Sequence, residues 1–310
     1  MGNNKSKVKR TLSNSSKKHH QNSQYLLSKE SESRNLDKEK ELTYYLSNHN
    51  DEDIDRQHFN HFFRKHIFQN NFSVPIEEGL IQGGCKVLDI GCGPGSWLLD
   101  LASKYENSYF FGIDIKPVYP NEIKPKNLEF CEADMFNGLP FPDNEFDFVH
   151  QEVMSFIIKA DQWNYVISEL IRVTKPGGFI EIVEYISPEN SGPVLTNVYK
   201  THFDLCLQRG VDMSLIPNLD KIIESHQNIS QVHRDERSFI IGPNGGKAGL
   251  VIQDIIITFN TSDLATDDIS SKKGISKEEY KNMILRDFKN ELKITKPKLK
   301  VCRFWAQKNA

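Results

Sequence analysis

The stretch from Lys86 to Trp97, KVLDIGCGPGSW, constrains the fold more than any other part of the chain. It begins with an apolar run that one carboxylate, Asp89, interrupts, and three glycines follow at alternate positions, Gly91, Gly93 and Gly95. An apolar pattern with helical spacing starts directly afterwards. This order predicts a buried parallel strand, a tight glycine loop and the first turn of a helix. Glycine suits such a loop because it accepts positive φ and lets a ligand lie against the backbone.

The glycine spacing excludes two common nucleotide-binding loops. A dinucleotide-binding loop needs G-x-G-x-x-G, whereas this chain has D-x-G-x-G-x-G with the acid inside the motif, so NAD(P) is not expected. A phosphate-binding P-loop needs Lys-Ser or Lys-Thr after the glycines, and neither pair follows here. The stretch instead resembles the first motif of the class I S-adenosylmethionine-dependent methyltransferases. Their cofactor carries an ammonium, a carboxylate and a sulfonium but no phosphate, which suits a glycine loop beside a carboxylate.

Further motifs of that family follow in order. The segment Tyr109–Asp114 reads as a second strand whose final acid lies nineteen residues past Gly95, where a carboxylate accepts both ribose hydroxyls in nucleotide-binding folds. Asp134 and Met135 follow a short third strand. The resemblance implies that the acid takes the adenine amino group and that the next side chain packs on the ring. Taken alone, Asp134 would be a helix N-cap.

Two later segments extend the resemblance to residues 42–187. Leu139–Gln151 is similar to the family's approach to strand four, and Lys175-Pro-Gly-Gly178 precedes an apolar fifth strand. The resemblance implies an α/β fold with a Rossmann-like, doubly wound, seven-stranded sheet that is mostly parallel with an antiparallel last strand. We expect residues 298–306 to form that last strand beside the fifth, and Ser276 to open a helix through a capping box. Residues 245–258 fit helix and strand equally.

The resemblance implies S-adenosyl-L-methionine as the cofactor. The residues expected to bind it lie on the glycine loop and where the first four strands end. They are Asp89, Gly91, Cys92, Gly93, Gly95, Asp114, Ile115, Ala133, Asp134, Met135 and Gln151.

Methyl transfer from a sulfonium mainly requires alignment of the acceptor and exclusion of water, and a general base helps where the acceptor is a hydroxyl or an amine. The sequence does not single out a base, and the candidates are Gln151, Glu152, Tyr185 and His202. The Asn/Asp-Pro-Pro-Tyr box of amino-methylating nucleic-acid enzymes is absent, since residues 151–154 read QEVM. A small-molecule acceptor is therefore favoured, with a protein acceptor as an alternative.

The segment before the glycine loop resembles one fungal branch of the superfamily, the proteins related to regulators of secondary metabolism. Residues 44–46 (YYL) and 50–58 (NDEDIDRQH) carry this likeness. Two functions therefore stay open. The first is a methyltransferase that acts on a small molecule through an O, N or C acceptor. The second is a cofactor-binding regulatory protein that acts through a protein partner with little or no methyl transfer.

Residues 51–68 have the pattern of a helix with acids in its first turn. Phe59, Phe62, Phe63, His66 and Ile67 recur at steps of three and four and predict one buried apolar face. This helix would either cap the cofactor or merely cover the sheet. We expect a methyltransferase domain over residues 41–310, with an N-terminal cap helix (41–80), a cofactor-binding half (81–187) and a substrate or C-terminal half (188–310).

Residues 1–40 are rich in Asn, Ser, Lys and Gln and are expected to be a disordered basic tail. Their start, MGNNKS, fits the N-myristoylation pattern, with Gly2 as the acceptor. Basic residues among positions 1–18 would supply the second signal that stable attachment to an anionic membrane surface requires. A nuclear-localisation signal at residues 5–18 and a plain solvated tail are the alternatives.

Composition bounds the remaining possibilities. Residues 1–29 hold seven Lys and Arg and no acid, which leaves 32 basic against 42 acidic residues in the rest, a poor balance for binding nucleic acid. Five scattered cysteines without a C-x-x-C pair indicate a reducing compartment and no metal site. No window reaches the ~18 apolar residues of a membrane span, so we expect an intracellular, cytoplasmic protein.

Overall fold

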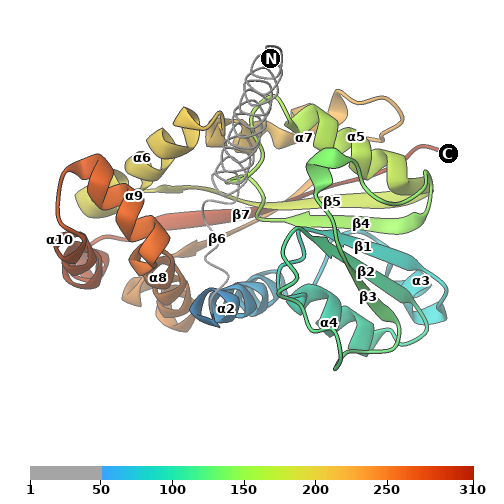
Figure 1. Ribbon diagram of the computed structural model, residues 1–310, viewed down its shortest axis with the longest axis horizontal. Helices are drawn as coiled ribbons and strands as arrows, with labels where there is room; N and C mark the ends of the chain where they lie inside the picture. Colours follow the sequence, from blue (N-terminus) through green and yellow to red (C-terminus); the bar gives the residue numbers. More distant parts are fainter. Residues whose placement is uncertain (1–50) are drawn as a thin grey trace, which may run out of the picture. The chain divides into compact units, whose positions relative to one another are not determined.

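The computed structural model describes residues 51–310, which are built on a seven-stranded sheet with the strand order β3-β2-β1-β4-β5-β7-β6 (Figure 1). Neighbours from β3 to β5 pair in parallel. The seventh strand lies antiparallel between β5 and β6. The predicted α/β architecture and the antiparallel last strand are thus confirmed. The strands are β1 (Lys86–Ile90), β2 (Tyr109–Asp114), β3 (Leu128–Glu132), β4 (Phe146–Glu152), β5 (Thr174–Glu189), β6 (His233–Ile240) and β7 (Lys298–Gln307).

Helices cover both faces of the sheet because alternate residues of each strand enter different cores. In β1, Val87 enters the core beneath the helices α3 and α4, whereas Leu88 and Ile90 enter the core beneath α5 and α7. The helices are α2 (Asp51–Phe68), α3 (Glu77–Gln82), α4 (Ser96–Lys104), α5 (Trp163–Val173), α6 (Pro193–Gln208), α7 (Leu219–Glu224), α8 (Gly246–Thr261), α9 (Asp263–Lys273), α10 (Lys277–Asn282) and α11 (Lys289–Ile294), with shorter turns η1 (Met135–Asn137), η2 (Met213–Asn218), η3 (Pro243–Gly245) and the π-helical η4 (Met283–Phe288).

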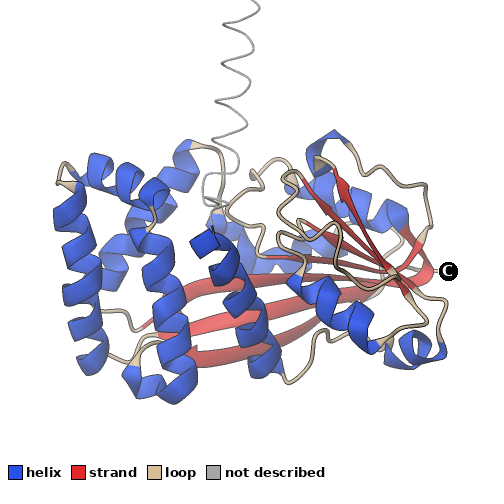
Figure 2. Ribbon diagram, turned by 60° about the horizontal axis from the view of Figure 1, so that its bottom comes forward, coloured by secondary structure: helices blue, strands red, loops and turns tan. Residues whose placement is uncertain are grey.

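The C-terminal half adds a group of helices at one end of the sheet. Figures 1 and 2 show α6, α8, α9 and α10 gathered at the end where the long strand β5 finishes. The segment whose pattern fitted helix and strand equally is the helix α8, which packs against α2. Ser276 forms the predicted capping box, since its hydroxyl accepts from Glu279 N and the Glu279 carboxylate accepts from Ser276 N.

The first described helix, α2, buries a different face from the predicted one. Phe59 and Phe62 keep 62% and 56% of their surface exposed and His66 is exposed as well, so the prediction of one buried apolar face was wrong for these three residues. The buried side chains of α2 include Asn60, His61 and Arg64, together with Phe63. Asn60 and Arg64 hydrogen-bond to the sheet and His61 lies 3.6 Å from Asp100 on α4, and these contacts offset part of the cost of desolvation.

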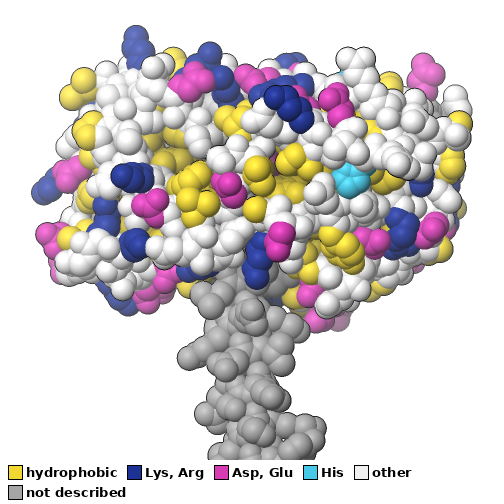
Figure 3. Space-filling model, turned by 90° about the horizontal axis from the view of Figure 1, so that it is seen from above, with side chains coloured by type: hydrophobic (Ala, Val, Ile, Leu, Met, Phe, Trp, Pro, Cys, Tyr) yellow, Lys and Arg dark blue, Asp and Glu magenta, His cyan; other side chains and the backbone are white. Residues whose placement is uncertain are grey.

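Several sequence predictions fall outside the described residues. The basic tail, the acylation pattern at Gly2 and the YYL motif all precede residue 51, and they stay predictions. Within residues 51–310 no helix combines the length and the apolar character needed to cross a bilayer. On the face drawn in Figure 3, acidic and basic side chains alternate around a band of hydrophobic ones, and neither charge forms a continuous patch.

Candidate active site

The glycine loop between β1 and α4 is held closely against its surroundings. The N–H groups of Gly91 and Cys92 both donate to Ile113 O, at 2.8 and 3.0 Å, which ties the loop to the end of β2. Gly91 has a φ of 70°, and a Cβ there would lie 2.6 Å from the Met154 sulfur. Gly93 also has positive φ, and a Cβ there would collide with the carboxamide oxygen of Gln57. Glycine is therefore favoured at both positions by the positive φ, and the Met154 and Gln57 side chains would have to move to admit a Cβ.

Asp114, the acid at the end of β2, contacts the glycine loop directly. Its Oδ2 accepts from Gly93 N at 2.8 Å, and its Oδ1 accepts from Lys116 N at 3.0 Å. Burial raises the pKa of Asp114, while the hydrogen bonds from Lys116 and Gly93 oppose the rise. The half-buried Ile115 follows it, and Ala133 N donates to Asp114 O at 3.0 Å. The structure thus brings the predicted ribose-binding acid and the predicted loop together.

The ends of β3 and β4 meet beside that loop. Gln151 is fully buried, its Nε2 lies 3.6 Å from the Met135 sulfur, and its Oε1 has no hydrogen-bond partner among residues 51–310. Asp134 caps η1, because its carboxylate accepts from Phe136 N at 3.0 Å and from Asn137 Nδ2 at 3.1 Å. The N-cap reading of Asp134 is therefore correct. Its predicted role toward adenine stays a prediction.

Asp89 bonds within the sheet. Its Oδ1 lies 2.8 Å from Nδ1 of His150 on the neighbouring strand β4, and the His150 ring stacks on Trp97 with the ring centres 3.9 Å apart. Burial raises the pKa of Asp89, and the hydrogen bond with His150 opposes this. The carboxylate that precedes the loop is therefore anchored by a histidine of the neighbouring strand whose ring packs against the helix α4. Its predicted contact with the cofactor stays a prediction.

The helix α2 joins the loop to the ends of β4 and β5. Gln57 lies over Gly93, and Nδ1 of His58 lies 2.7 Å from Ser96 Oγ at the start of α4. Arg64 donates from Nε to Glu152 at 3.0 Å and from Nη2 to the second oxygen of the same carboxylate. The Tyr185 hydroxyl donates to Asn60 at 2.7 Å. Sequence reasoning missed this polar set, although one signal was present: positions 53, 57, 60 and 64 are polar and share one helical face.

Three of the four candidate bases are poorly suited to take a proton. Burial alone would raise the pKa of Glu152, but Arg64 and two histidines lower it to about 2. Burial raises the pKa of Tyr185, whose hydroxyl is already a donor to Asn60. Gln151 does not ionise. His202 on α6 differs, because burial lowers the pKa of its imidazole and Nε2 bonds to Asn260 at 2.9 Å.

Glu184 fixes the segment after β4. Its carboxylate accepts from Met154 N at 2.7 Å, from Ser155 N at 2.9 Å and from Ser155 Oγ at 2.7 Å. Burial raises the pKa of Glu184 to about 7, and these three hydrogen bonds oppose the rise. Because the carboxylate is engaged on both oxygens, Glu184 holds Met154 over the glycine loop.

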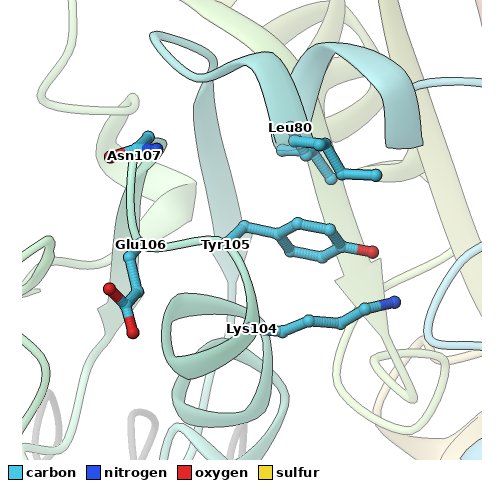
Figure 4. A pocket seen from close by; sticks show the side chains of 6 residues that line it. Leu80, Lys104, Tyr105, Glu106 and Asn107 are labelled. Atoms are coloured by element: carbon cyan, nitrogen blue, oxygen red, sulfur yellow. The ribbon is translucent and has the colours of Figure 1, made fainter.

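A surface hollow of about 300 Å³ lies away from this site (Figure 4). It is formed between α3 and the segment that leads from α4 into β2. The strands β1 and β2 begin beside the hollow, whereas the glycine loop follows the end of β1. The hollow and the loop therefore lie at opposite ends of the strands, about 16 Å apart. The hollow therefore is not the cofactor site. Its lining residues are Leu80, Ile81, Lys104, Tyr105, Glu106 and Asn107.

Comparison with known families identifies the part of the chain that carries the loop. Residues 87–178 match the family described as "Methyltransferase domain". This part of the chain is similar to methyltransferase domains. The matched segment begins in β1 and ends at Gly178 in β5, so it contains the glycine loop, Asp114, Asp134 and Gln151. The resemblance to the class I S-adenosylmethionine-dependent methyltransferases is confirmed.

Proteins similar to this chain occur in fungi. The chain is 34% identical over 156 residues to the N-methyltransferase verN of Clonostachys rogersoniana, a match that covers 49% of this chain and 53% of that protein. It is 28% identical over 173 residues to the secondary metabolism regulator laeA of Coprinopsis cinerea, covering 51% and 42%. The protein-methionine methyltransferase laeA of Emericella nidulans is 26% identical over 161 residues, covering 50% and 42%. The chain thus spans about half the length of these relatives or less.

Proposed function

We propose that the protein is an S-adenosylmethionine-dependent methyltransferase that acts on a small molecule. The observation that carries the proposal is the hydrogen bond from Gly93 N to Asp114, because it unites the glycine loop with the acid at the end of β2. The family match over the same residues supports it. An acid and backbone amides at the carboxyl edge of a parallel sheet form the usual place for a nucleoside ligand.

The residues present fit this cofactor. Asp114 would hold the two ribose hydroxyls, and Met135 would pack on the adenine. Gln151 offers a buried carboxamide oxygen without a partner in the described chain, a suitable acceptor for an ammonium or amino N–H. The proposed binding set remains Asp89, Gly91, Cys92, Gly93, Gly95, Asp114, Ile115, Ala133, Asp134, Met135 and Gln151.

When bound, the cofactor supplies a methyl group already activated by a sulfonium. The protein then has to align the acceptor and exclude water. Two segments are placed for this: Gln57 of α2 lies over Gly93, and Met154 lies over Gly91. Arg64 and Glu152 pair between these two segments, so the helix α2 is fixed to the end of β4.

A second function is favoured by a specific observation. Several relatives are named as regulators of secondary metabolism, and the chain is 28% identical to one of them over 173 residues. A regulatory protein would bind the cofactor yet act through a protein partner with little or no methyl transfer. Incubation of the full chain with S-adenosylmethionine and fractionated cell extract separates the two. Labelled methyl groups in a low-molecular-weight fraction support the small-molecule enzyme, labelled protein supports a protein acceptor, and binding without turnover supports the regulator.

The Asp114→Ala variant is expected to bind S-adenosylmethionine at least tenfold more weakly than the parent. It loses two hydrogen bonds to the ribose, and bonds to a charged acceptor contribute about 1.5–3 kcal/mol each. Calorimetric titration measures the effect. Glu106→Ala, in the hollow at the opposite edge of the sheet, is the matched control and should bind like the parent. Equal binding by Asp114→Ala would remove Asp114 from the site, and no binding by the parent would remove the proposed function.

A further inference from the structure

We propose that His202 is the general base of this methyltransferase and that its acceptor therefore offers an N–H or O–H group. The inference rests on the proposed function and names the substrate class of the same site. It is carried by a buried group of three side chains from three helices, His202 of α6, Asn260 of α8 and Tyr280 of α10.

The hydrogen bonds of Asn260 determine which nitrogen of His202 carries the proton. Asn260 Nδ2 donates to Ile256 O at 2.8 Å, which identifies the other amide atom, Oδ1, as the acceptor. The Tyr280 hydroxyl donates to that oxygen at 3.0 Å, and Nε2 of His202 lies 2.9 Å from it. Because a carbonyl oxygen only accepts, Nε2 must be the protonated nitrogen. Nδ1 then carries the free lone pair, and it has no hydrogen-bond partner within residues 51–310.

The surroundings keep this imidazole neutral. The ring is 6% exposed, and burial lowers its pKa, as an unprotonated base requires at neutral pH. The charged groups that face it are Arg209, which lowers the pKa further, and Asp268, which raises it. Arg209 and Asp268 pair with each other at 2.8 Å and act in opposite directions, and the hydrogen bond with Asn260 partly opposes the effect of burial on the pKa. An oriented neutral imidazole held by an amide is the arrangement that activates nucleophiles in other enzymes.

His202 is connected to the glycine loop through one aromatic side chain. Its ring packs on Phe259, with the ring centres 5.3 Å apart. Phe259 also contacts Phe156, at 6.4 Å between ring centres, and the Arg56 guanidinium lies 5.6 Å from the centre of the Phe259 ring. Phe156 lies two residues after Met154, which covers Gly91, and Arg56 directly precedes Gln57, which covers Gly93. His202 is thus linked, through the Phe259 ring, to both segments that cover the cofactor loop.

The proposed step balances without a further reactant. The acceptor nitrogen or oxygen forms its bond to the methyl carbon, the bond between that carbon and the cofactor sulfur breaks with its electron pair on sulfur, and the acceptor's proton passes to Nδ1 of His202. A thioether acceptor has no proton to lose and would not use such a base. The proposed base therefore implies an acceptor other than the methionine thioether of a protein-methionine methyltransferase, the name given to the Emericella nidulans relative.

The first test determines which nitrogen of the His202 imidazole is protonated, and it needs neither cofactor nor acceptor. Nitrogen NMR of the uniformly labelled full chain, with the signals assigned through His202→Gln, should show His202 protonated at Nε2 and unprotonated at Nδ1. Asn260→Asp keeps the acceptor oxygen and adds a charge, so it should raise the pKa of His202 by about 1–3 units. Asn260→Leu should abolish the tautomer preference. A proton on Nδ1 in the parent protein would overturn the proposal.

The second test measures the rate of methyl transfer to acceptors in the fractionated extract. His202→Gln should lower the rate by about 10²-fold or more, since a positioned base contributes 10²–10⁴. Its affinity for S-adenosylmethionine should equal that of the parent in calorimetry. The matched control is His226→Gln, which changes another histidine whose pKa burial lowers, at the end of α7, and it should retain full activity. Full activity of His202→Gln, or a product methylated on sulfur, would overturn the base while leaving the proposed function intact. Absence of cofactor binding by the parent would instead remove the proposed function and, with it, the role of His202 in methyl transfer.

Discussion

The Arg64→Leu variant is expected to lose about 3–5 kcal/mol of unfolding free energy. Arg64 is 5% exposed, and two of its nitrogens bond to the Glu152 carboxylate. Burial by itself disfavours this guanidinium, but Glu152 and Tyr185 outweigh burial and raise the pKa of Arg64. Removing the cation leaves Glu152, whose side chain is 17% exposed, as a largely buried charge without its counter-ion. Urea unfolding of parent and variant measures the difference.

Two further variants show whether the loss comes from the unpaired carboxylate. Adding Glu152→Gln to Arg64→Leu removes the charge and should recover a large part of the stability, because the penalty belongs to the uncompensated ion. Arg286→Leu removes a guanidinium that is 73% exposed and pairs with Asp287, so it should change stability by less than about 1 kcal/mol. A loss of that small size for Arg64→Leu itself would show that the buried pair does not anchor α2.

The second large effect concerns Glu184 and pH. Its pKa is about 7 in the folded protein against an ordinary value of 4.5, because burial disfavours the carboxylate. Between these two pH values the folded chain keeps a proton that the unfolded chain has released. The unfolding free energy should therefore fall as the pH rises from 4.5 to about 7, by about 3 kcal/mol for this group, and stay level above that.

The Glu184→Gln variant isolates this contribution, since glutamine does not titrate. The difference in unfolding free energy between parent and variant should shift by the same amount across that pH range, while the other ionisable groups cancel. Glu278→Gln replaces an exposed carboxylate and should give a constant difference from the parent. Parallel curves for parent and Glu184→Gln would contradict the prediction and place the proton elsewhere in the site.

The sheet could be predicted from the sequence because its signals are local. A glycine loop after an apolar run, an acid at the end of the next strand and Lys-Pro-Gly-Gly before the fifth strand each lie within about a dozen residues. The predicted boundaries of β2 and β7 agree with the structure within one residue, whereas β5 extends from Thr174 through the Lys-Pro-Gly-Gly segment to Glu189. The position of Asp114 at the end of β2, where it contacts Gly93, followed from the same local pattern.

The acceptor side could not be predicted in the same way because its contacts join distant residues. Arg64 pairs with Glu152 across 88 positions, and His202 meets Asn260 across 58. In α2 the phenylalanines gave the stronger helical pattern, so the polar face with Asn60 and Arg64 was passed over. A polar residue is buried only where another group can form a hydrogen bond or ion pair with it, and no local sequence pattern identifies that group.

The place of β7 in the sheet has a consequence for the newly made chain. This strand separates β5 from β6, yet it is synthesised after both. Roughly 110 residues lie between the end of β5 and the start of β7, and ribosomes need about 5–20 s to add them. Throughout that interval β5 exposes a long unpaired edge, a template for association with other chains. A nascent polypeptide halted before Lys298 should therefore be a preferred chaperone client, and release should follow once residues 298–307 emerge.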